Sequence, residues 1–182
     1  MKHLFYKYQG TGNDFVMIDN RLGGFEKKNT DLIAHLCNRR TGVGADGLIL
    51  LESDLDYDFR MVYFNADGNE STMCGNGGRC IVAFANFLGI IEESTEFIAI
   101  DGPHLARIDQ AYVELKMQEV STVSSNENYH ILDTGSPHYV ALQSGLQAID
   151  MNVEGSKIRH SAPFDASGVN VNFAEKINED TF

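Results

Sequence analysis

The sequence predicts an α+β fold in which a curved sheet surrounds a buried central helix. Apolar residues fall mostly in short runs that read as strands, separated by turns rich in glycine, asparagine and aspartate. The segment 79–88 is apolar on nearly every side. A helix of that kind is usually buried, so we expect a sheet wrapped around it rather than a helix packed by one face.

In the first part of the chain, strands are expected at residues 4–8, 15–19, 47–52 and 58–64. A first helix is predicted over residues 31–40, where apolar residues recur at helical spacing after Asn29 and Thr30, either of which can cap it. The basic pair Arg39-Arg40 suits its last turn. The second helix follows a glycine-rich stretch and covers 79–88, with Gly89 as its C-cap.

The remainder is rich in strands, which are expected at residues 97–100, 106–108, 112–117, 131–132, 139–142 and 169–173. A helix or loop is expected near residues 148–159. The polar segment 121–128 reads as a connection, so we predict one domain over 1–120 and a partial second one over 121–182. The final residues, 175–182, read as the entry into another strand, and truncation is an open alternative.

Composition limits the classes of function. The 182 residues are 43% hydrophobic and 22% charged, as in a soluble globular protein. No apolar run approaches the ~20 residues that span a bilayer, and the first eight residues lack the apolar core of a signal peptide. We therefore expect a cytoplasmic protein without a membrane partner. A net charge of −12, with no basic cluster larger than a pair such as Arg39-Arg40, argues against nucleic-acid binding.

Cysteine and histidine usage argues against disulfides and metals. Three cysteines, Cys37, Cys74 and Cys80, are an odd count in a chain without a secretory signal, so free thiols are expected. Six histidines are scattered without the spacing of a metal motif, and no metal site is predicted.

Cys74 stands out because glycines surround it at the start of a predicted helix. Helix N-termini carry N–H groups without partners and a partial positive charge, which can hold a carboxylate and favour a thiolate. A thiolate beside a bound carboxylate is a suitable base for a proton on the adjacent carbon. The alternative is a buried structural cysteine in a glycine-rich loop. Cys80 lies ~600° and ~9 Å further along the helix and is expected to pack, as is Cys37 on the apolar stripe of the first helix.

Two other patterns are rejected as sites. Residues 42–47 match G-x-G-x-x-G, but a predicted helix precedes them and a strand follows, which is the reverse of the dinucleotide-binding order. The sequon at residues 69–71 has no meaning without a secretory signal.

Three stretches together resemble the diaminopimelate epimerase family: residues 10–15 (GTGNDF), 64–68 (FNADG) and 73–80 (MCGNGGRC). Residues 135–138 (GSPH) and the pair Val169-Asn170 fall where the family has related turns. The resemblance spans the chain from its first predicted strand to its last. It implies two similar domains, each a curved mixed or antiparallel sheet around a helix, with the second domain incomplete here.

The resemblance also implies a function. Family members invert one α-carbon of diaminopimelate, converting the LL to the meso form for lysine and cell-wall synthesis, without a cofactor and with two cysteines as acid and base. Cys74 is expected to be one catalytic cysteine, and His138 matches a histidine thought to tune it. Substrate binding is expected from Asn13, Asn65, Gly75, Asn76 and Asn170. Many members form homodimers.

The sequence also departs from the family pattern. Ser136 stands where asparagine is common and Gly47 where some members have glutamine, so a contact to the distal carboxylate is in question. The motif of the second catalytic cysteine is absent from the 182 residues, so this polypeptide alone is expected not to epimerise. A proline-racemase-like enzyme, a phenazine-biosynthesis-type isomerase and a non-catalytic binding domain stay open as alternatives.

Overall fold

The computed structural model describes residues 4–182, and it divides into two compact units, one ending at Met117 and the other covering Gln118–Phe182. Each unit is described by itself. Residues 1–3, part of the N-terminal segment that is expected to lack a signal peptide, lie outside the described part. The elements of the first unit are β1 (Tyr6–Gly10), β2 (Asn13–Asp19), α1 (Thr30–Cys37), β3 (Gly47–Glu52), β4 (Arg60–Asn65), α2 (Gly75–Phe87), β5 (Ser94–Ala99), β6 (Gly102–Asp109) and β7 (Tyr112–Leu115).

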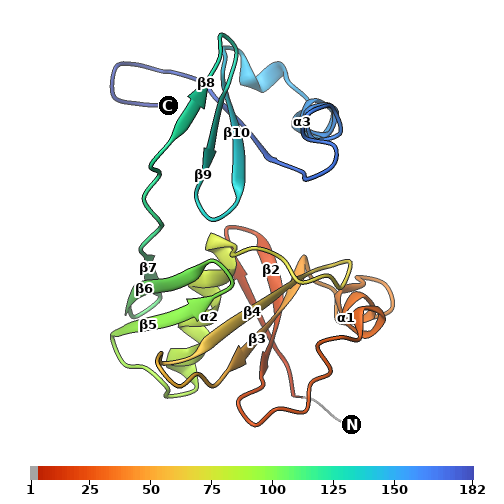
Figure 1. Cartoon of the computed structure of the whole chain (residues 1–182), viewed down its shortest axis with the longest axis vertical. Coiled ribbons are helices and arrows are strands. Elements are labelled where there is room, and N and C mark those ends of the chain that lie inside the picture. Colours follow the sequence, from red (N-terminus) through yellow and green to blue (C-terminus); the bar gives the residue numbers. More distant parts are fainter. Residues whose placement is uncertain (1–3) are drawn as a thin grey trace. The chain divides into compact units, whose positions relative to one another are not determined.

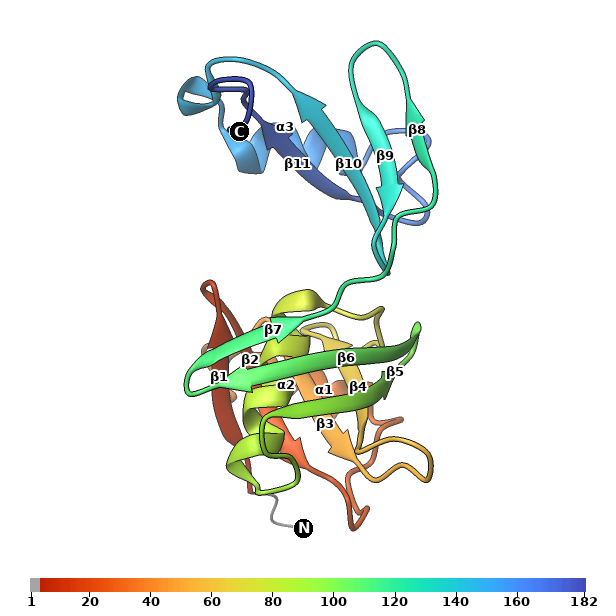
Figure 2. The same ribbon diagram turned by 90° about the vertical axis from the view of Figure 1, so that its left-hand side faces the viewer.

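The first unit is an α+β unit with a curled, mixed sheet whose seven strands follow the order of the chain. β2 pairs in parallel with β3, and β4 with β5, while the other neighbours are antiparallel. Figures 1 and 2 show α2 in the concave face of this sheet, where it contacts β1, β2, β3, β4, β6 and β7. The prediction of a sheet around an apolar helix is therefore confirmed.

Alternation along β2 explains how both faces of the sheet are covered. Phe15 and Met17 pack into the core around α2, whereas Val16 and Ile18 face the opposite side, where α1 packs. Because helices cover both faces, β2 and β3 carry continuous runs of apolar residues rather than a polar alternation. This double coverage fixes the starts of β2 and β3, where Asn13 and, opposite Gly47, Asn65 lie.

Helix α1 is shorter than predicted. It is capped by Asn29, whose side chain accepts from Leu32 N, but it ends at Cys37 rather than at residue 40. Asn38 is extended, and its side-chain oxygen accepts from the backbone N–H groups of Arg40 and Thr41. That local hydrogen bonding competes with the helix and ends it. The assignment of Arg39-Arg40 to the last helical turn was therefore wrong.

The second unit is a smaller sheet with one helix on it. Its strands β8 (Val123–Ser125), β9 (His130–Asp133), β10 (Pro137–Leu142) and β11 (Asn170–Ala174) are arranged in the order β11-β10-β9-β8. Between β10 and β11 lie the 3₁₀ helix η1 (Leu146–Ala148) and α3 (Met151–Arg159), which contacts β11. The core centres on Tyr139, Ala141 and Val169. Tyr139 stacks on Tyr129, with ring centroids 4.3 Å apart.

Two predictions for the second unit were wrong. β8 lies inside the segment 121–128, which was read as a plain connection; its three residues are all exposed, so no apolar alternation marked it. Residues 175–182 form no extended strand and contain an isolated bridge between Asn178 and Thr181. Their side chains are mostly exposed, so no packing surface holds them as a strand.

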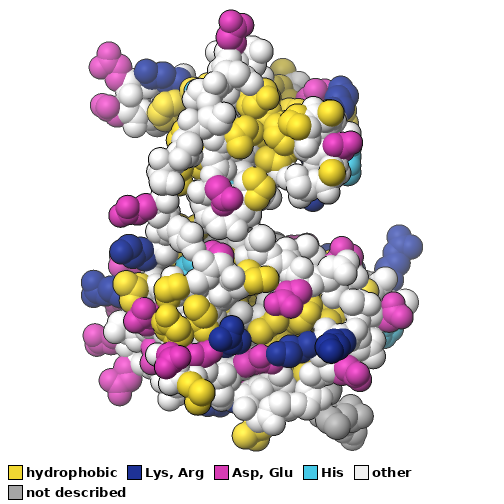
Figure 3. Space-filling model, in the orientation of Figure 1, with side chains coloured by type: hydrophobic (Ala, Val, Ile, Leu, Met, Phe, Trp, Pro, Cys, Tyr) yellow, Lys and Arg dark blue, Asp and Glu magenta, His cyan; other side chains and the backbone are white. Residues whose placement is uncertain are grey.

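The surface carries charges of both signs. Figure 3 shows Lys and Arg side chains interspersed with Asp and Glu on the visible face of the first unit, without a region of one sign. Among residues 4–182, no helix has both the length and the apolar character needed to cross a membrane. Nor do three or more His, Cys, Asp or Glu side chains of the described chain come together in a way that could hold a metal ion.

Candidate active site

Cys74 occupies the N-cap position of α2, where the backbone changes from extended to helical, with φ −112° and ψ 120°. Its carbonyl oxygen accepts the first helical hydrogen bond, from Gly78 N at 2.7 Å. Its side chain makes no capping hydrogen bond and is half-buried. Because the first N–H groups of a helix have no intrahelical partner, those of Gly75 and Asn76 can bind an anion beside the sulfur.

The glycines after Cys74 have different tasks. α2 begins at Gly75, four residues before the predicted start, so Gly77 and Gly78 lie inside the helix. A Cβ on Gly78 would be 2.6 Å from Met73 Cε, and one on Gly77 would be 2.9 Å from Ile49 Cδ1. These two glycines therefore let α2 seat closely in the core. Gly75 has more room, because the nearest atom to its Cβ position is Met117 Sδ at 3.7 Å.

Asn13 and Asn76 lie beside the sulfur of Cys74. The Cys74 thiol donates to Asn13 Oδ1 at 3.7 Å, and Asn76 Nδ2 donates to the same oxygen at 3.4 Å. The tight turn at Thr11 and Gly12, both with positive φ, brings the start of β2 to this point. The Thr11 hydroxyl oxygen lies 3.2 Å from Asn76 Oδ1, and its hydrogen is also directed to Gly10 O at 2.7 Å. The structure thus gathers four of the predicted site residues, Asn13, Cys74, Gly75 and Asn76, at one end of α2.

A charged network supports Asn13 from the other side. Asn13 Nδ2 donates to Asp46 Oδ2 at 2.8 Å, and Arg39 bridges Asp46 and Asp14 at 2.9 Å and 2.7 Å. The Arg39 guanidinium holds the pKa of the Asp14 carboxyl well below its usual range, with a further contribution from Lys7. The hydrogen bond from Asn13 is the main cause that lowers the pKa of Asp46. Sequence reasoning missed Asp46, which lay within the rejected glycine pattern.

Asn65 ends β4 and contacts a tyrosine that the sequence did not single out. The Tyr63 hydroxyl donates to Asn65 Oδ1 at 2.9 Å. Burial, and then the nearby Cys74, raise the pKa of Tyr63 above its usual range. A Cβ on Gly47 would lie 2.6 Å from Tyr63 Cε2. The Tyr63 ring therefore occupies the space that a side chain at position 47 would need.

The other two cysteines are sealed in the cores. Cys37 and Cys80 are buried, as the sequence predicted, and each is 3% exposed. Burial raises the pKa of both thiols to about 11. Neither is therefore suited to proton transfer with a bound ligand.

We expect iodoacetamide at about pH 8 to alkylate Cys74 well before Cys37 and Cys80, because the thiolate is the reactive form and burial suppresses it in the other two. Peptide mass spectrometry of the native protein identifies the labelled residue. In denaturant all three thiols should react at similar rates. Equal labelling of the three in the native protein would contradict this prediction.

Two predicted site residues face each other across adjacent strands of the second unit. His138 on β10 pairs in register with Asn170 on β11. Asn172 Nδ2 lies 3.0 Å from His138 Nδ1, and it also donates to the carbonyl oxygens of Tyr139 and Asn170, both at 3.1 Å. Carbonyl oxygens only accept, so the amide nitrogen of Asn172 faces the ring and His138 Nδ1 acts as an acceptor.

Ser136 takes part in the same cluster of the second unit. Its hydroxyl oxygen accepts from Asn170 Nδ2 at 3.1 Å, and the same nitrogen donates to Pro137 O at 3.3 Å. The amide nitrogen of Asn170 is therefore held by the turn before β10. The oxygen of this amide stays available to a ligand of the second unit.

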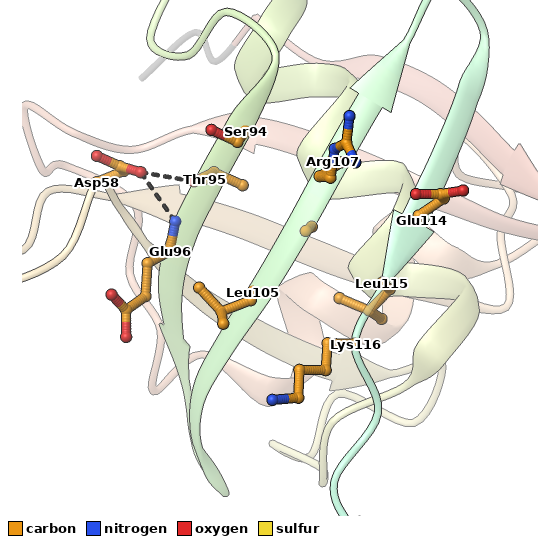
Figure 4. A pocket seen from close by; sticks show the side chains of 10 residues that line it. Asp58, Ser94, Thr95, Glu96, Leu105, Arg107, Glu114, Leu115 and Lys116 are labelled. Carbon is orange, nitrogen blue, oxygen red and sulfur yellow. Dashed lines mark hydrogen bonds between the residues drawn. The ribbon is translucent and has the colours of Figure 1, made fainter.

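A pocket of about 590 Å³ lies away from these residues, on the outer face of β5, β6 and β7. Figure 4 shows Leu105 and Leu115 in its lining, with Asp58 accepting from Thr95 and from Glu96 N. That carboxylate is already satisfied, and none of the predicted site residues lines the pocket. The pocket is therefore separate from the candidate site at the Cys74 end of α2.

Solved structures establish the class of fold. A phenazine biosynthesis protein from Bacillus anthracis superposes with a TM-score of 0.67 at 15% identity, covering 98% of this chain and 69% of that one. A probable proline racemase from Agrobacterium radiobacter gives 0.63 at 16% identity, covering 97% of this chain and 67% of that one. At these identities the likeness shows the fold alone, which is the racemase-like α+β fold.

Sequence comparison is more specific. The profile of the diaminopimelate epimerase family matches residues 5–120. A diaminopimelate epimerase from Flavobacterium psychrophilum is 56% identical over 178 residues, which are 97% of this chain and 70% of the relative. One from Chlorobaculum tepidum is 44% identical over 174 residues, 91% of this chain and 67% of the relative. The chain belongs to the diaminopimelate epimerase family, and it is an isomerase.

Proposed function

We propose that this chain carries the Cys74 half of an active site that inverts one α-carbon of diaminopimelate, interconverting the LL and meso forms without a cofactor, for the synthesis of lysine and peptidoglycan precursors. One observation carries the proposal. The Cys74 sulfur lies at the N-terminus of a buried helix, beside the open N–H groups of Gly75 and Asn76 and the amide of Asn13. Membership of the diaminopimelate epimerase family supports the choice of substrate.

The proposed reaction is a proton transfer at carbon. The N–H groups of Gly75 and Asn76 hold the substrate α-carboxylate, and the Cys74 thiolate removes the adjacent α-proton. The electron pair of the broken C–H bond passes into the carboxylate, where the helix N-terminus stabilises the added negative charge. A second acid on the opposite face then returns a proton to the carbon. In the reverse reaction the Cys74 thiol donates its proton to the carbon and becomes a thiolate again.

The asparagines recognise the two ends of the substrate in this proposal. Amide oxygens accept from ammonium groups, and amide nitrogens donate to carboxylates. Asn13, Asn65, Asn76 and Asn170 are proposed to bind the substrate on the strength of the family resemblance. His138 tunes the acid and base chemistry. Its Nδ1 accepts from Asn172, which leaves Nε2 as the ring donor in the neutral form.

The second proton-transfer group of the mechanism is not assigned to residues 4–182. Cys37 and Cys80 are sealed in the cores, and burial raises both pKa values to about 11. Proton removal by Cys74 and inversion of configuration can therefore be measured separately. The first needs Cys74, whereas the second needs both groups.

The proposal is tested by proton NMR in D₂O with LL-diaminopimelate, and with proline in a parallel sample. We expect the α-proton signal of diaminopimelate to disappear slowly and that of proline to persist. Because the described residues offer one open thiol, we expect the configuration of the recovered diaminopimelate to be retained.

Exchange of proline alone would overturn the proposal in favour of a proline-racemase-like activity. Binding of diaminopimelate in a calorimeter without any exchange would overturn it in favour of a non-catalytic binding domain. Inversion by these 182 residues would refute the assignment of a single open thiol.

Other parts of the proposal concern organisation. We propose two domains, 1–120 and 121–182, which the division into compact units after Met117 supports. A cytoplasmic location is supported by free thiols at Cys37 and Cys80. The charges of mixed sign support a protein without nucleic-acid partners. Homodimerisation is proposed from the family resemblance.

A further inference from the structure

The amide of Asn13 has one defined orientation, although its oxygen and nitrogen are similar in shape. Its Nδ2 faces Asp46 Oδ2 at 2.8 Å, and an ionised carboxylate can only accept a hydrogen bond. The amide nitrogen must therefore lie on the Asp46 side. As a result, Oδ1 is turned toward the Cys74 sulfur and Asn76 Nδ2.

Asp46 is itself held by a closed set of interactions between the starts of β2 and β3. Its carboxylate accepts from Arg39 at 2.9 Å and from Asp14 N at 3.1 Å. In return, Asp46 N donates to Asp14 Oδ1 at 3.1 Å, and Arg39 also binds that oxygen at 2.7 Å. Lys7 pairs with the other oxygen of Asp14 at 2.8 Å and also donates to Gly44 O. The carboxylate that faces Asn13 is thus fixed in position and kept charged.

The neighbouring amide, that of Asn76, is oriented by Arg79, whose charge is opposite to that of Asp46. The Arg79 guanidinium donates to Asn76 Oδ1. Asn76 Nδ2 is therefore turned toward Asn13 Oδ1. Asp46 beside Asn13 and Arg79 beside Asn76 therefore orient both amides in the same direction, with each nitrogen on the side of Asp46 and each oxygen on the side of Arg79. If Asn13 were reversed, two N–H groups would oppose each other.

We propose that Asp46, held by Arg39, is a positioning residue that orients the Asn13 amide so that its oxygen faces Cys74. The inference rests on the proposed function of Cys74. With the oxygen toward it, the sulfur has an acceptor for its S–H group. Without the Asp46 charge, the amide can rotate and donate N–H to the sulfur instead, which favours the thiolate. Loss of a nearby negative charge acts in the same direction.

Asp46→Asn tests this inference, and Asp54→Asn is its matched control. Asp54 also accepts from a backbone N–H, that of Asp56, and from a guanidinium, that of Arg60, but in a loop before β4. The readout is the rate of Cys74 alkylation between about pH 6 and pH 10, measured by mass spectrometry. Tyr63, Arg79 and Cys80, the titratable or charged groups around Cys74 on β4 and α2, are unchanged in both variants.

We expect the alkylation profile of Asp46→Asn to move to lower pH by about half a unit or more, and that of Asp54→Asn to stay in place. The α-proton exchange rate at saturating diaminopimelate should fall about 10-fold in Asp46→Asn, because a rotated amide misplaces its polar atoms. A drop in thermal stability with an unmoved profile would assign Asp46 a structural role and overturn the inference.

Failure of the inference can be told apart from failure of the proposed function. The alkylation profile needs no substrate, so a shift in Asp46→Asn supports the positioning role even if diaminopimelate does not exchange. Conversely, Cys74-dependent exchange of diaminopimelate with an unmoved profile would overturn the positioning role and leave the proposed function in place.

Discussion

Cys74→Ala and Cys74→Ser are expected to lower the rate of α-proton exchange in diaminopimelate by about 10²–10⁴-fold, the usual contribution of a positioned general base. Alanine removes the base, and serine replaces the thiol with a hydroxyl that does not ionise near neutral pH. Diaminopimelate binding should change little in Cys74→Ala, because the N–H groups of Gly75 and Asn76 that are proposed to hold the carboxylate remain. Proton NMR in D₂O and calorimetry measure the two effects.

Cys80→Ala and Cys37→Ala serve as controls, since both thiols are buried and have no proposed part in the chemistry. Each truncation leaves a small cavity and should lower stability while the exchange rate at saturating substrate stays within about 3-fold of the original. If Cys80→Ala abolished exchange and Cys74→Ala did not, the site would have to be placed further along α2.

Gly68→Ala is expected to cost about 2–4 kcal/mol of stability, from backbone strain together with a steric clash. Gly68 adopts φ +90°, and a Cβ there would lie 2.2 Å from the carbonyl oxygen of Thr30, the first residue of α1. The clash involves backbone on both sides, so no side-chain rotation relieves it. Gly68 also closes the turn that positions Asn65, through a 2.9 Å hydrogen bond to Asn65 O.

Gly89→Ala is the matched control for this substitution, because Gly89 has φ +69° but nothing lies within 4 Å of its Cβ position. It should cost only the backbone strain of about 1–2 kcal/mol. Urea titrations followed by circular dichroism measure both variants. Equal losses in the two would show that Gly68 is required for its φ angle alone and that its closeness to α1 does not matter.

The sequence predicts those elements best whose burial is complete. β3 spans residues 47–52, as predicted, because its first five residues are buried and apolar on both faces. The start of α2 was placed four residues late, since glycine is a poor helix former in isolation and Gly77 and Gly78 are helical only because they pack against the core. The exposed strand β8 carried no pattern at all.

Predicting the site from sequence depended on which contacts are local. The thiol and the first helical N–H groups are adjacent in the chain, so residues 74–76 could be singled out directly. Asp46 and Tyr63 could not be singled out in this way. Asp46 binds Asn13, which is distant in sequence, and Tyr63 lies near Cys74, which belongs to another element. Only the pairing of β2, β3 and β4 brings these residues close together. Tertiary hydrogen bonds to asparagine leave no periodic signal.

Enclosure of α2 by six strands sets how the reactive end of that helix can move. The free energy of local unfolding is lowest in exposed segments and highest in an element that is packed on all sides. We therefore expect α2 to be among the last elements of the first unit to unfold. The Cys74 sulfur therefore lies at the end of a firmly packed helix. Any local motion that lets a ligand reach this sulfur has to occur in the shorter, more exposed segments nearby, such as the turn at Thr11 and Gly12.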